Sequence, residues 1–289
     1  SVNGTSARSI TLTGALSGAG GLTKTGEGNL VLSGGGTFAG TATSTGGSLF
    51  LGTTAWTNAS VASSAGGVIQ PGTLATSGTS TVAALNFNGG SPTFRAKFTG
   101  GDQFAVTGVN NFAVSSPTVI TVIPGSDLFV NDVIPLIDYN GTIGGASGFA
   151  GLSATAAGNP HFALSLENDV TNTVVNVKID SLDSLIWKGN VNGSWDVNTT
   201  SNWETVSNSL TSKFYDVDAV KFTDDGSANT TITLTGAIKP SSVEFDASIA
   251  YTLQGAPITG SSGLIKKNSG ALTLLNDNTY TGLTSITGG

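Results

Sequence analysis

The chain has 289 residues, 41 of them glycine, and its 11 Lys and Arg against 18 Asp and Glu give a net charge of −7. This balance excludes a nucleic-acid-binding protein, because such binding relies on clustered Lys and Arg. The absence of cysteine excludes disulfides and thiolate metal sites, and no run approaches the ~18 apolar residues that span a membrane as a helix.

Short stretches of alternating apolar and polar residues recur along the chain, for example at 9–13, 29–33 and 231–235, and end at Gly, Asn, Asp or Ser. A period of two predicts short β-strands. Apolar residues also recur at intervals of 20, 19, 18 and 18, at Leu12, Leu32, Leu51, Ile69 and Phe87. This spacing is too long for tight hairpins and favours a coil whose turns stack strands in parallel. A β-sandwich remains the alternative.

The stretch 94–180 is less regular. It contains four prolines and a Gly/Ala-rich run at 141–158. Because proline is excluded from central strands except at bulges and edges, we expect protruding loops or a side lobe here. His161, the one histidine of the chain, follows Pro160 and is interpreted as a loop residue.

Three tryptophans eight residues apart, Trp187, Trp195 and Trp203, mark the next stretch. Flat aromatic faces stack on sugars, so these residues are the candidate glycan-binding site. The competing interpretation is that they fill a wide turn of the coil as core residues. We favour the core interpretation.

Asp224 and Asp225 belong to the densest acidic group of the chain and precede a glycine, so they are the candidate calcium ligands. The chain lacks the EF-hand loop and the glycine-rich nonapeptide calcium repeat, so a solvated acidic turn is the favoured interpretation and no cofactor is expected. Glycoside hydrolysis needs two carboxylates at a set distance. Two pairs of aspartates are separated by about one turn of the coil, Asp196 with Asp216 and Asp225 with Asp246. Few cationic residues lie near them in the sequence. We expect no enzyme.

The chain ends inside a copy of its own beginning. Residues 17–47 align without a gap on 259–289 at an offset of 242. Twelve of the 31 pairs are identical, at Gly18, Gly21, Leu22, Lys24, Gly28, Leu30, Leu32, Thr37, Gly40, Thr45, Gly46 and Gly47. Upstream, 10–14 resembles 251–255 at an offset of 241. The pattern indicates one period of a longer array.

These two segments resemble the autotransporter-associated β-strand repeat of bacterial passenger domains. The resemblance rests on Gly21-Leu22-Thr23-Lys24 through Thr37-Phe38-Ala39-Gly40 and on the second copy, which departs from the usual pattern at Asn268 and Leu275. Two looser segments, around Trp187 to Phe222 and from 94 to 179, are similar to modules that accompany this repeat. The resemblance implies a right-handed parallel β-helix, export to the cell surface, and no catalysis by the repeat.

We therefore expect four segments: coils with the first repeat at 1–93, an irregular module at 94–180, a Trp- and Asp-containing module at 181–258, and the second repeat at 259–289. The expected function is that of a structural, non-catalytic extracellular or cell-surface fibre whose partners are copies of itself. The alternatives are an adhesin that binds surface glycans and a polysaccharide-active enzyme. Uncapped coil ends template another copy, so the residues expected in self-assembly are the apolar ones of the repeats: Leu12, Leu30, Leu32, Leu264, Leu272 and Leu274.

Overall fold

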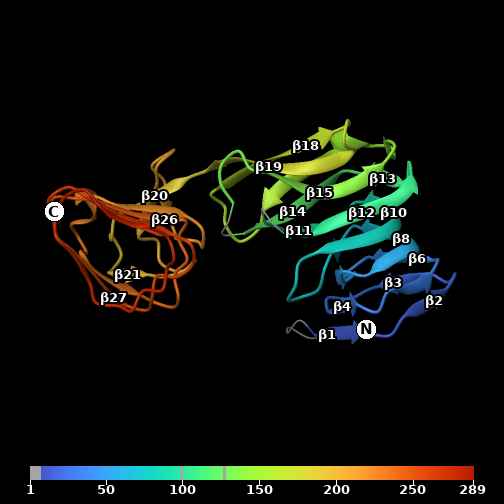
Figure 1. Ribbon diagram of the computed structural model, residues 1–289, viewed down its shortest axis with the longest axis horizontal. Helices are drawn as coiled ribbons and strands as arrows, with labels where there is room; N and C mark the ends of the chain where they lie inside the picture. The colour runs from blue at the N-terminus through green and yellow to red at the C-terminus, as the bar shows by residue number, and fades with distance from the viewer. Residues whose placement is uncertain (1–7, 98–99, 126–127) are drawn as a thin grey trace. The chain divides into compact units, whose positions relative to one another are not determined.

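A computed structural model describes residues 8–97, 100–125 and 128–289 of the chain (Figure 1). The protein is nearly all β, with 54% strand and 2% helix, and its stacked parallel coils form a β-solenoid of about 12 turns. The expected all-β parallel coil is confirmed. In the described ranges, no helix has the length and apolar character needed to cross a membrane.

The chain divides into two compact units. Unit 1 comprises Ser1–Ala157 and Ala163–Asp180, and unit 2 comprises Gly158–Phe162 and Ser181–Gly289. The chain passes from unit 1 to unit 2 after Asp180, and the short segment Gly158–Phe162 also belongs to unit 2. The four expected segments stay a prediction.

Unit 1 builds its coils from short strands that stack along parallel ladders. In chain order these are β1 Ser9–Leu12, β2 Leu16–Gly18, β3 Leu22–Lys24, β4 Asn29–Leu32, β5 Gly36–Phe38, β6 Thr41–Ser44, β7 Gly47–Phe50, β8 Ala55–Ser64, β9 Gly67–Gln70, β10 Thr79–Asn88, β11 Thr93–Ala96, β12 Gln103–Val109, β13 Phe112–Ser116, β14 Thr118–Pro124, β15 Val133–Asn140, β16 Ile143–Gly144, β17 Leu152–Ala156, β18 Phe162–Asp169 and β19 Val174–Leu182, with one 3-10 turn, η1 Phe149–Gly151. One face stacks β1-β4-β7-β9, and the opposite ladder starts β3-β6-β8-β10.

The period predicted from the sequence matches the first coils. Leu12 lies opposite Leu32, as the interval of 20 predicts. Ile69 instead lies opposite Leu49 and not Leu51. The pairing of Leu51 with Ile69 that the interval predicts is therefore wrong by two residues. The strand β7 ends at Phe50, so Leu51 already lies in the corner after it.

Glycine lets neighbouring coils approach closely. A Cβ atom added at Gly34 would collide with the backbone of Gly14 in the preceding coil. The ladder therefore needs a residue without a side chain at this corner.

The stretch 94–180 continues the solenoid and is less regular than the coils before it, as expected, whereas the expected protruding loops or side lobe stay a prediction. Its strands β12, β13, β14 and β17 pair in parallel with those before or after them. The coils here are longer: Phe104 and its partner Ile137 are 33 residues apart, compared with 20 for Ile10 and Leu30. Pro124 ends β14, and Pro135 lies where the register of β15 shifts, as the rule for proline in sheets requires.

Antiparallel strands close one end of unit 1. β19 pairs with β15 in the antiparallel sense, and β18 lies outside β19 as the last strand of the ladder. At the other end, β1, β2 and β3 form the first coil (Figure 1). Unit 1 is therefore a parallel solenoid with one antiparallel cap.

Unit 2 stacks its coils along two ladders. Its strands are β20 Ser184–Trp187, β21 Ser194–Trp195, β22 Trp203–Thr205, β23 Thr211–Ser212, β24 Ala219–Phe222, β25 Thr231–Leu234, β26 Ser242–Asp246, β27 Tyr251–Gly255, β28 Gly263–Lys267, β29 Leu272–Leu274 and β30 Thr284–Ile286, with one 3-10 turn, η2 Asp224–Gly226. The ladders run β23-β22-β20-β24-β26-β28-β30 and β21-β25-β27-β29. β22 and β23 pair in the antiparallel sense and cap the first coil, whereas β29 and β30 form the last.

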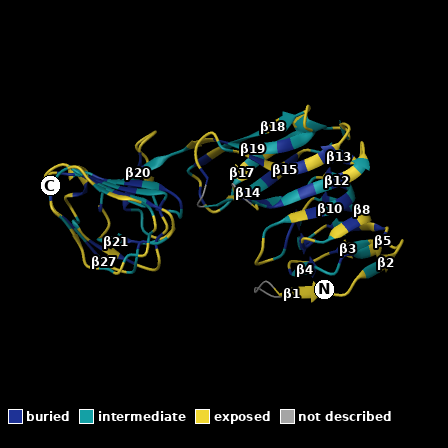
Figure 2. Ribbon diagram, viewed as in Figure 1, coloured by how far each residue is buried: buried dark blue, intermediate teal, exposed yellow. Residues whose placement is uncertain are grey.

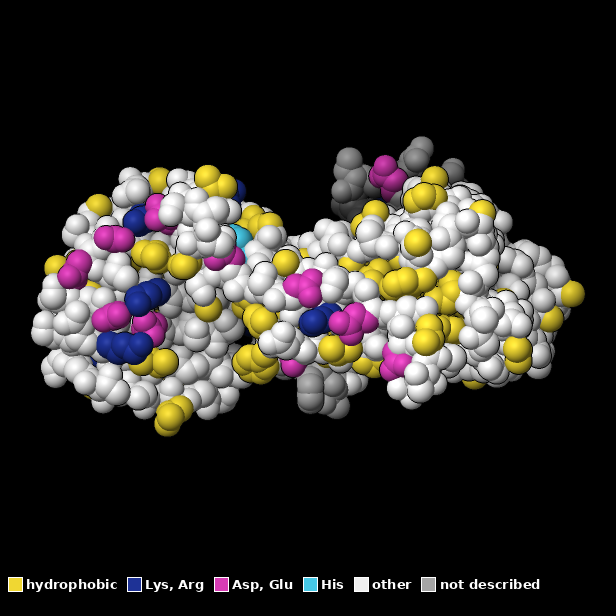
Figure 3. Space-filling model, turned by 90° about the horizontal axis from the view of Figure 1, so that it is seen from above, with side chains coloured by type: hydrophobic (Ala, Val, Ile, Leu, Met, Phe, Trp, Pro, Cys, Tyr) yellow, Lys and Arg dark blue, Asp and Glu magenta, His cyan; other side chains and the backbone are white. Residues whose placement is uncertain are grey.

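Each coil buries its inward side chains (Figure 2). The core of unit 2 is unusually aromatic, and Phe222 stacks on Phe245 of the next coil with ring centroids 4.4 Å apart. Lysines and carboxylates interleave over one outer face of this unit (Figure 3). There Lys221 bonds Glu244 at 3.0 Å and Asp246 at 3.1 Å, on the neighbouring strand. Aromatic stacking inside and cross-strand ion pairs outside repeat along the same ladder.

Candidate functional site: the open ends of the two units

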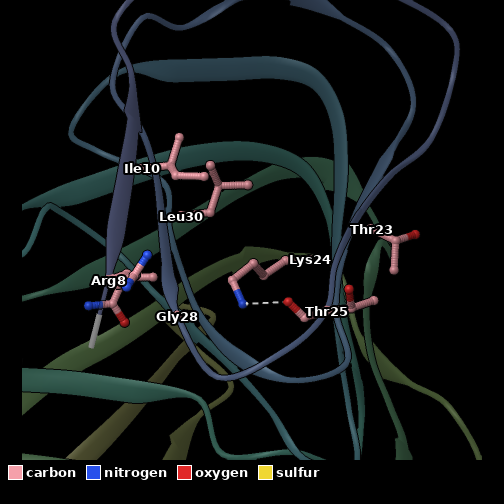
Figure 4. A pocket seen from close by; sticks show the side chains of 8 residues that line it. Arg8, Ile10, Thr23, Lys24, Thr25, Gly28 and Leu30 are labelled. Atoms are coloured by element: carbon pink, nitrogen blue, oxygen red, sulfur yellow. Dashed lines mark hydrogen bonds between the residues drawn. The ribbon is translucent and has the colours of Figure 1, made fainter. Parts of the chain in front are cut away.

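A buried lysine holds the corner of a coil at the N-terminal end of unit 1. Lys24 Nζ donates hydrogen bonds to the carbonyl oxygens of Thr25 at 2.9 Å, Gly26 at 2.6 Å and Gly46 at 2.9 Å. Figure 4 shows its side chain turned into the coil toward Thr25. Burial lowers the pKa of Lys24. The ammonium thus replaces water as the partner of three carbonyls that face inward.

The same arrangement recurs at the C-terminal end of unit 2. Lys266 Nζ donates to the carbonyl oxygens of Lys267 at 2.6 Å, Asn268 at 2.7 Å and Gly288 at 3.3 Å. Each of these four residues is 242 positions after its counterpart in the first lysine corner. The sequence repeat is therefore also a structural repeat, with one copy at the N-terminal end of unit 1 and the other at the C-terminal end of unit 2.

The N-terminal end of unit 1 leaves apolar side chains in solvent. β1 pairs with β4 on one side, and within the described residues it has no partner on the other. Ile10 is 53% exposed and Leu12 37% exposed. A hollow of about 200 Å³, lined by Ile10, Lys24 and Leu30 among others, opens into this end (Figure 4).

The C-terminal end of unit 2 has the same character. β29 and β30 each pair on one side, with β27 and β28, and in the described part of the chain nothing pairs with their outer edges. Leu274 is 38% exposed, Ile286 72% and Leu283 81%. A hollow of about 260 Å³ opens here and is lined by Leu264, Leu272 and Ile286 among others. An unpaired strand edge beside exposed apolar side chains is a surface suited to another strand.

The six residues predicted for self-assembly differ in their exposure and form three groups. Leu12 and Leu274 lie exposed on the two end coils, Leu30 and Leu272 are half-buried beside the hollows, and Leu32 and Leu264 are buried. The sequence analysis missed the more exposed side chains at these ends: Ile10, Leu283 and Ile286. Their signal was available, because they also lie in or beside the repeat segments.

The three candidate glycan-binding tryptophans are core residues. Trp187 and Trp195 have no exposed surface, and Trp203 is 1% exposed. Their rings contact each other edge to face, with centroids 5.0 to 5.3 Å apart. No ring face is available to a sugar, so the favoured core interpretation is confirmed and the candidate glycan-binding site is wrong. The spacing of the three residues could not separate the two interpretations, because it is the same for a core cluster and for a platform.

The two candidate calcium ligands have other partners. Asp224 accepts hydrogen bonds from the backbone and hydroxyl of Ser248, 24 residues later, and hydrogen bonding to Ser248 lowers its pKa. Asp225 pairs with Lys188 at 3.1 Å. In the described ranges, no group of three or more His, Asp or Glu side chains is placed to hold a metal ion.

The carboxylates considered for an enzyme also have local partners. Asp196 accepts hydrogen bonds from the backbone N–H and hydroxyl of Thr200. Asp216 accepts one from the backbone of Lys239, and Asp246 pairs with Lys221. These contacts stabilise turns and ladders, and they give no support to a pair of glycosidase carboxylates.

Comparison with known proteins does not assign a family. No family model matches the chain, and no curated protein or solved structure gives a significant match.

Proposed function

We propose that the protein is a structural element of an extracellular or cell-surface fibre, in which solenoids join end to end. One observation carries the proposal. The two copies of one repeat lie at the N-terminal end of unit 1 and the C-terminal end of unit 2, where the outer edges of β1, β29 and β30 are unpaired within the described residues. The resemblance to the autotransporter-associated β-strand repeat supports the same location and role.

Unit 1 shows what kind of strand can cover the open edges at the end of unit 2. The counterparts of β29 and β30 there are β4 and β6, which lie inside the stack. β4 is covered by β7, and β6 by β8, both in parallel. A parallel strand from a coil of similar size therefore suits the outer edge of β29, as β7 suits that of β4.

Joining different ends gives a heterologous contact, because the C-terminal end of one copy and the N-terminal end of another are different surfaces. Such a contact generates filaments when the coil axis continues across the junction, and rings when the rotation closes. Each junction pairs two rows of backbone groups and covers the exposed side chains of both ends, such as Ile10 and Ile286. This role requires no catalysis.

Charged substitutions at an open end test the proposal. The wild type is expected to sediment as species that lengthen with protein concentration and to appear as filaments by electron microscopy. Leu274→Lys with Ile286→Lys places two charges on the last coil and is expected to leave a monomer.

The matched control is Val170→Lys. Val170 is 70% exposed and lies between β18 and β19, at the capped end of unit 1. This variant should assemble like the wild type. A wild type that stays monomeric at every concentration, or a control that loses assembly as fully as the double variant, would contradict docking of open ends.

A further inference from the structure

His161 lies in a turn before β18, as the sequence suggested, and its side chain takes part in a chain of hydrogen bonds inside unit 2. Its Nδ1 lies 2.9 Å from Asp218 Oδ1, and its Nε2 lies 2.9 Å from Ser212 Oγ. These residues are 57 and 51 positions away in the sequence. A carboxylate, an imidazole and a hydroxyl in this order are the three groups of a serine nucleophile triad, which is recognised by geometry and not by sequence order.

The carboxylate of the three is held firmly. The side chain of Asp218 has no exposed surface, and that of His161 is 6% exposed. Asp218 also accepts hydrogen bonds from the backbone N–H of Tyr215 at 2.8 Å and from Asn159 Nδ2 at 2.8 Å. Burial raises the pKa of Asp218, while its hydrogen bond with His161 opposes that rise. The Asp218 carboxylate thus accepts from three donors, one of which is the Nδ1–H of His161. With the proton on Nδ1, the Nε2 atom of His161 is free to accept the proton of Ser212.

The backbone beside Asp218 is strained. Val217 has a φ of 70°, in the left-handed region, although it is β-branched and buried. Such a conformation costs about 1–3 kcal/mol and persists only where the surroundings enforce it. Here it closes the turn in which the N–H of Asp218 bonds the carbonyl of Tyr215. Strained residues of this kind cluster at active sites.

The hydroxyl end of the triad is accessible. Ser212 is half-buried and lies on β23, the first strand of the seven-stranded ladder, which pairs with β22 on one side. An edge strand presents backbone N–H groups on its outer side. They are donors that a carbonyl oxygen of a substrate, or a developing oxyanion, can use.

We infer that Ser212, His161 and Asp218 form a nucleophile site for acyl groups, with Asn159 and Tyr215 as positioning residues. Ser212 Oγ attacks the carbonyl carbon of an ester while His161 Nε2 takes its proton. The C–O bond of the ester then breaks, and the alcohol leaves with the proton from His161. Water hydrolyses the acyl-serine by the reverse proton path. The site adds an activity to the structural role and does not depend on it.

A fluorophosphonate probe tests the inference, because the same attack displaces fluoride and leaves a stable phosphonyl group on the serine. Peptide mapping by mass spectrometry should place one label per chain on Ser212. Ser212→Ala should abolish it, and His161→Gln should slow labelling by about 100-fold or more. Absence of label on Ser212 in the folded wild type would overturn the inference.

Two further variants separate a triad from a merely reactive serine. Ser207 lies on the same hairpin and bonds a carboxylate, Asp183, without a histidine, so Ser207→Ala should label like the wild type. Asp218→Asn keeps the size of the side chain and should also slow labelling by about 100-fold or more, with the β-sheet circular dichroism retained. Equal labelling of Asp218→Asn and His161→Gln with the wild type would mean that no triad operates. The monomeric Leu274→Lys/Ile286→Lys variant should label normally, whatever the outcome for assembly.

Discussion

The hydrogen bonds of Lys24 and Lys266 explain why each lysine is buried inside an otherwise apolar coil. Each ammonium bonds three carbonyl oxygens at a corner where the backbone turns inward. The sequence alignment identified both residues as identical positions of the repeat, but it gave no reason for them. Only the structure shows that a long cationic side chain satisfies carbonyls that a shorter or apolar residue would leave unpaired.

Lys24→Met keeps the length of the side chain and removes its donors. We expect the free energy of unfolding to fall by about 2 kcal/mol, since hydrogen bonds to charged groups contribute ~1.5–3 kcal/mol. Urea unfolding followed by circular dichroism measures the change. Lys239→Met, at an exposed lysine, should change stability by about 0.5 kcal/mol or less. Equal stability of the two variants would show that the buried ammonium does not hold the corner.

The corner after each lysine needs a left-handed residue. Gly26 has a φ of 71° and Asn268, its counterpart, a φ of 57°. Asparagine tolerates this region better than other non-glycine residues, which explains the departure of the second copy from the usual pattern. Gly26→Ala should therefore lower the free energy of unfolding by about 1–2 kcal/mol, while Asn268→Gly should be close to neutral. Thermal unfolding of both variants measures these changes. An unchanged stability of Gly26→Ala would contradict the left-handed conformation at this corner.

Tyr251 gives unit 2 a dependence on alkaline pH. Its hydroxyl donates to the carbonyl of Thr223 at 2.6 Å, and burial, with smaller contributions from the charges of Asp224 and Asp225, raises the pKa of Tyr251 from 10.0 to about 12. Below pH 10 both the folded and the unfolded chain keep the proton. Between pH 10 and 12 only the unfolded chain loses it, so the free energy of unfolding falls as the pH rises, by about 2 kcal/mol over the window.

Tyr251→Phe isolates this effect from the lysines that titrate in the same range. The variant should be less stable near pH 8, by about 1 kcal/mol, because it lacks the hydrogen bond. Its stability should then fall less steeply than that of the wild type between pH 10 and 12. Parallel stability curves for the two proteins would contradict the raised pKa.

At the scale of the elements, alternation predicted the strands well and the register less well. The pairing of Leu12 with Leu32 follows from the interval, but Leu51 lies outside its strand, and the coils lengthen to 33 residues around β12 and β15. Alternation reports which side of a strand faces the core, whereas the register depends on the number of residues in each corner. That number changes from coil to coil and leaves no periodic signal.

The aromatic cluster of unit 2 is predicted to be inaccessible to solvent. All four tryptophans of the chain, including Trp56, are at most 1% exposed. The fluorescence of the folded protein should therefore be blue-shifted from that of the unfolded chain and resist quenching by acrylamide. Phe129→Trp, at a side chain 67% exposed, is the control and should add a fully quenched component. Strong quenching of the wild type would contradict the core assignment.

The Ser212, His161 and Asp218 cluster could not be predicted from the sequence. Its members share no motif and no coil interval, and His161 lies in the short segment 158–162, which packs with unit 2 although 163–180 belongs to unit 1. A lone histidine beside a proline carries no signal of its partners. The contact exists because the chain leaves unit 1 after Ala157, contributes residues 158–162 to unit 2, and then continues in unit 1.

For the whole molecule, the repeat was predictable and the caps were not. The alignment of 17–47 with 259–289 needs only identity at a fixed offset. The antiparallel strands β19 and β22 show the same alternation as the parallel strands, so pattern alone does not distinguish them. The antiparallel pairs leave β18 and β23 as edge strands of their own ladders, so the proposed function rests on the open edges of β1, β29 and β30 together with the repeat that they belong to or adjoin.

The most direct test uses the fact that the chain has no cysteine. Leucines of one column lie opposite each other in successive coils, as Leu12 and Leu32 do in unit 1 and Leu253 and Leu274 do in unit 2. If a junction keeps this register, Leu12 of a second copy lies opposite Leu274, within disulfide reach. The double variant Leu12→Cys/Leu274→Cys, oxidised in solution, should give a ladder of covalent polymers on a denaturing gel, while each single variant should give no species larger than a dimer. A double variant that remains monomeric, or a Leu274→Cys single variant that dimerises as readily as the double variant polymerises, would contradict head-to-tail joining of the open ends.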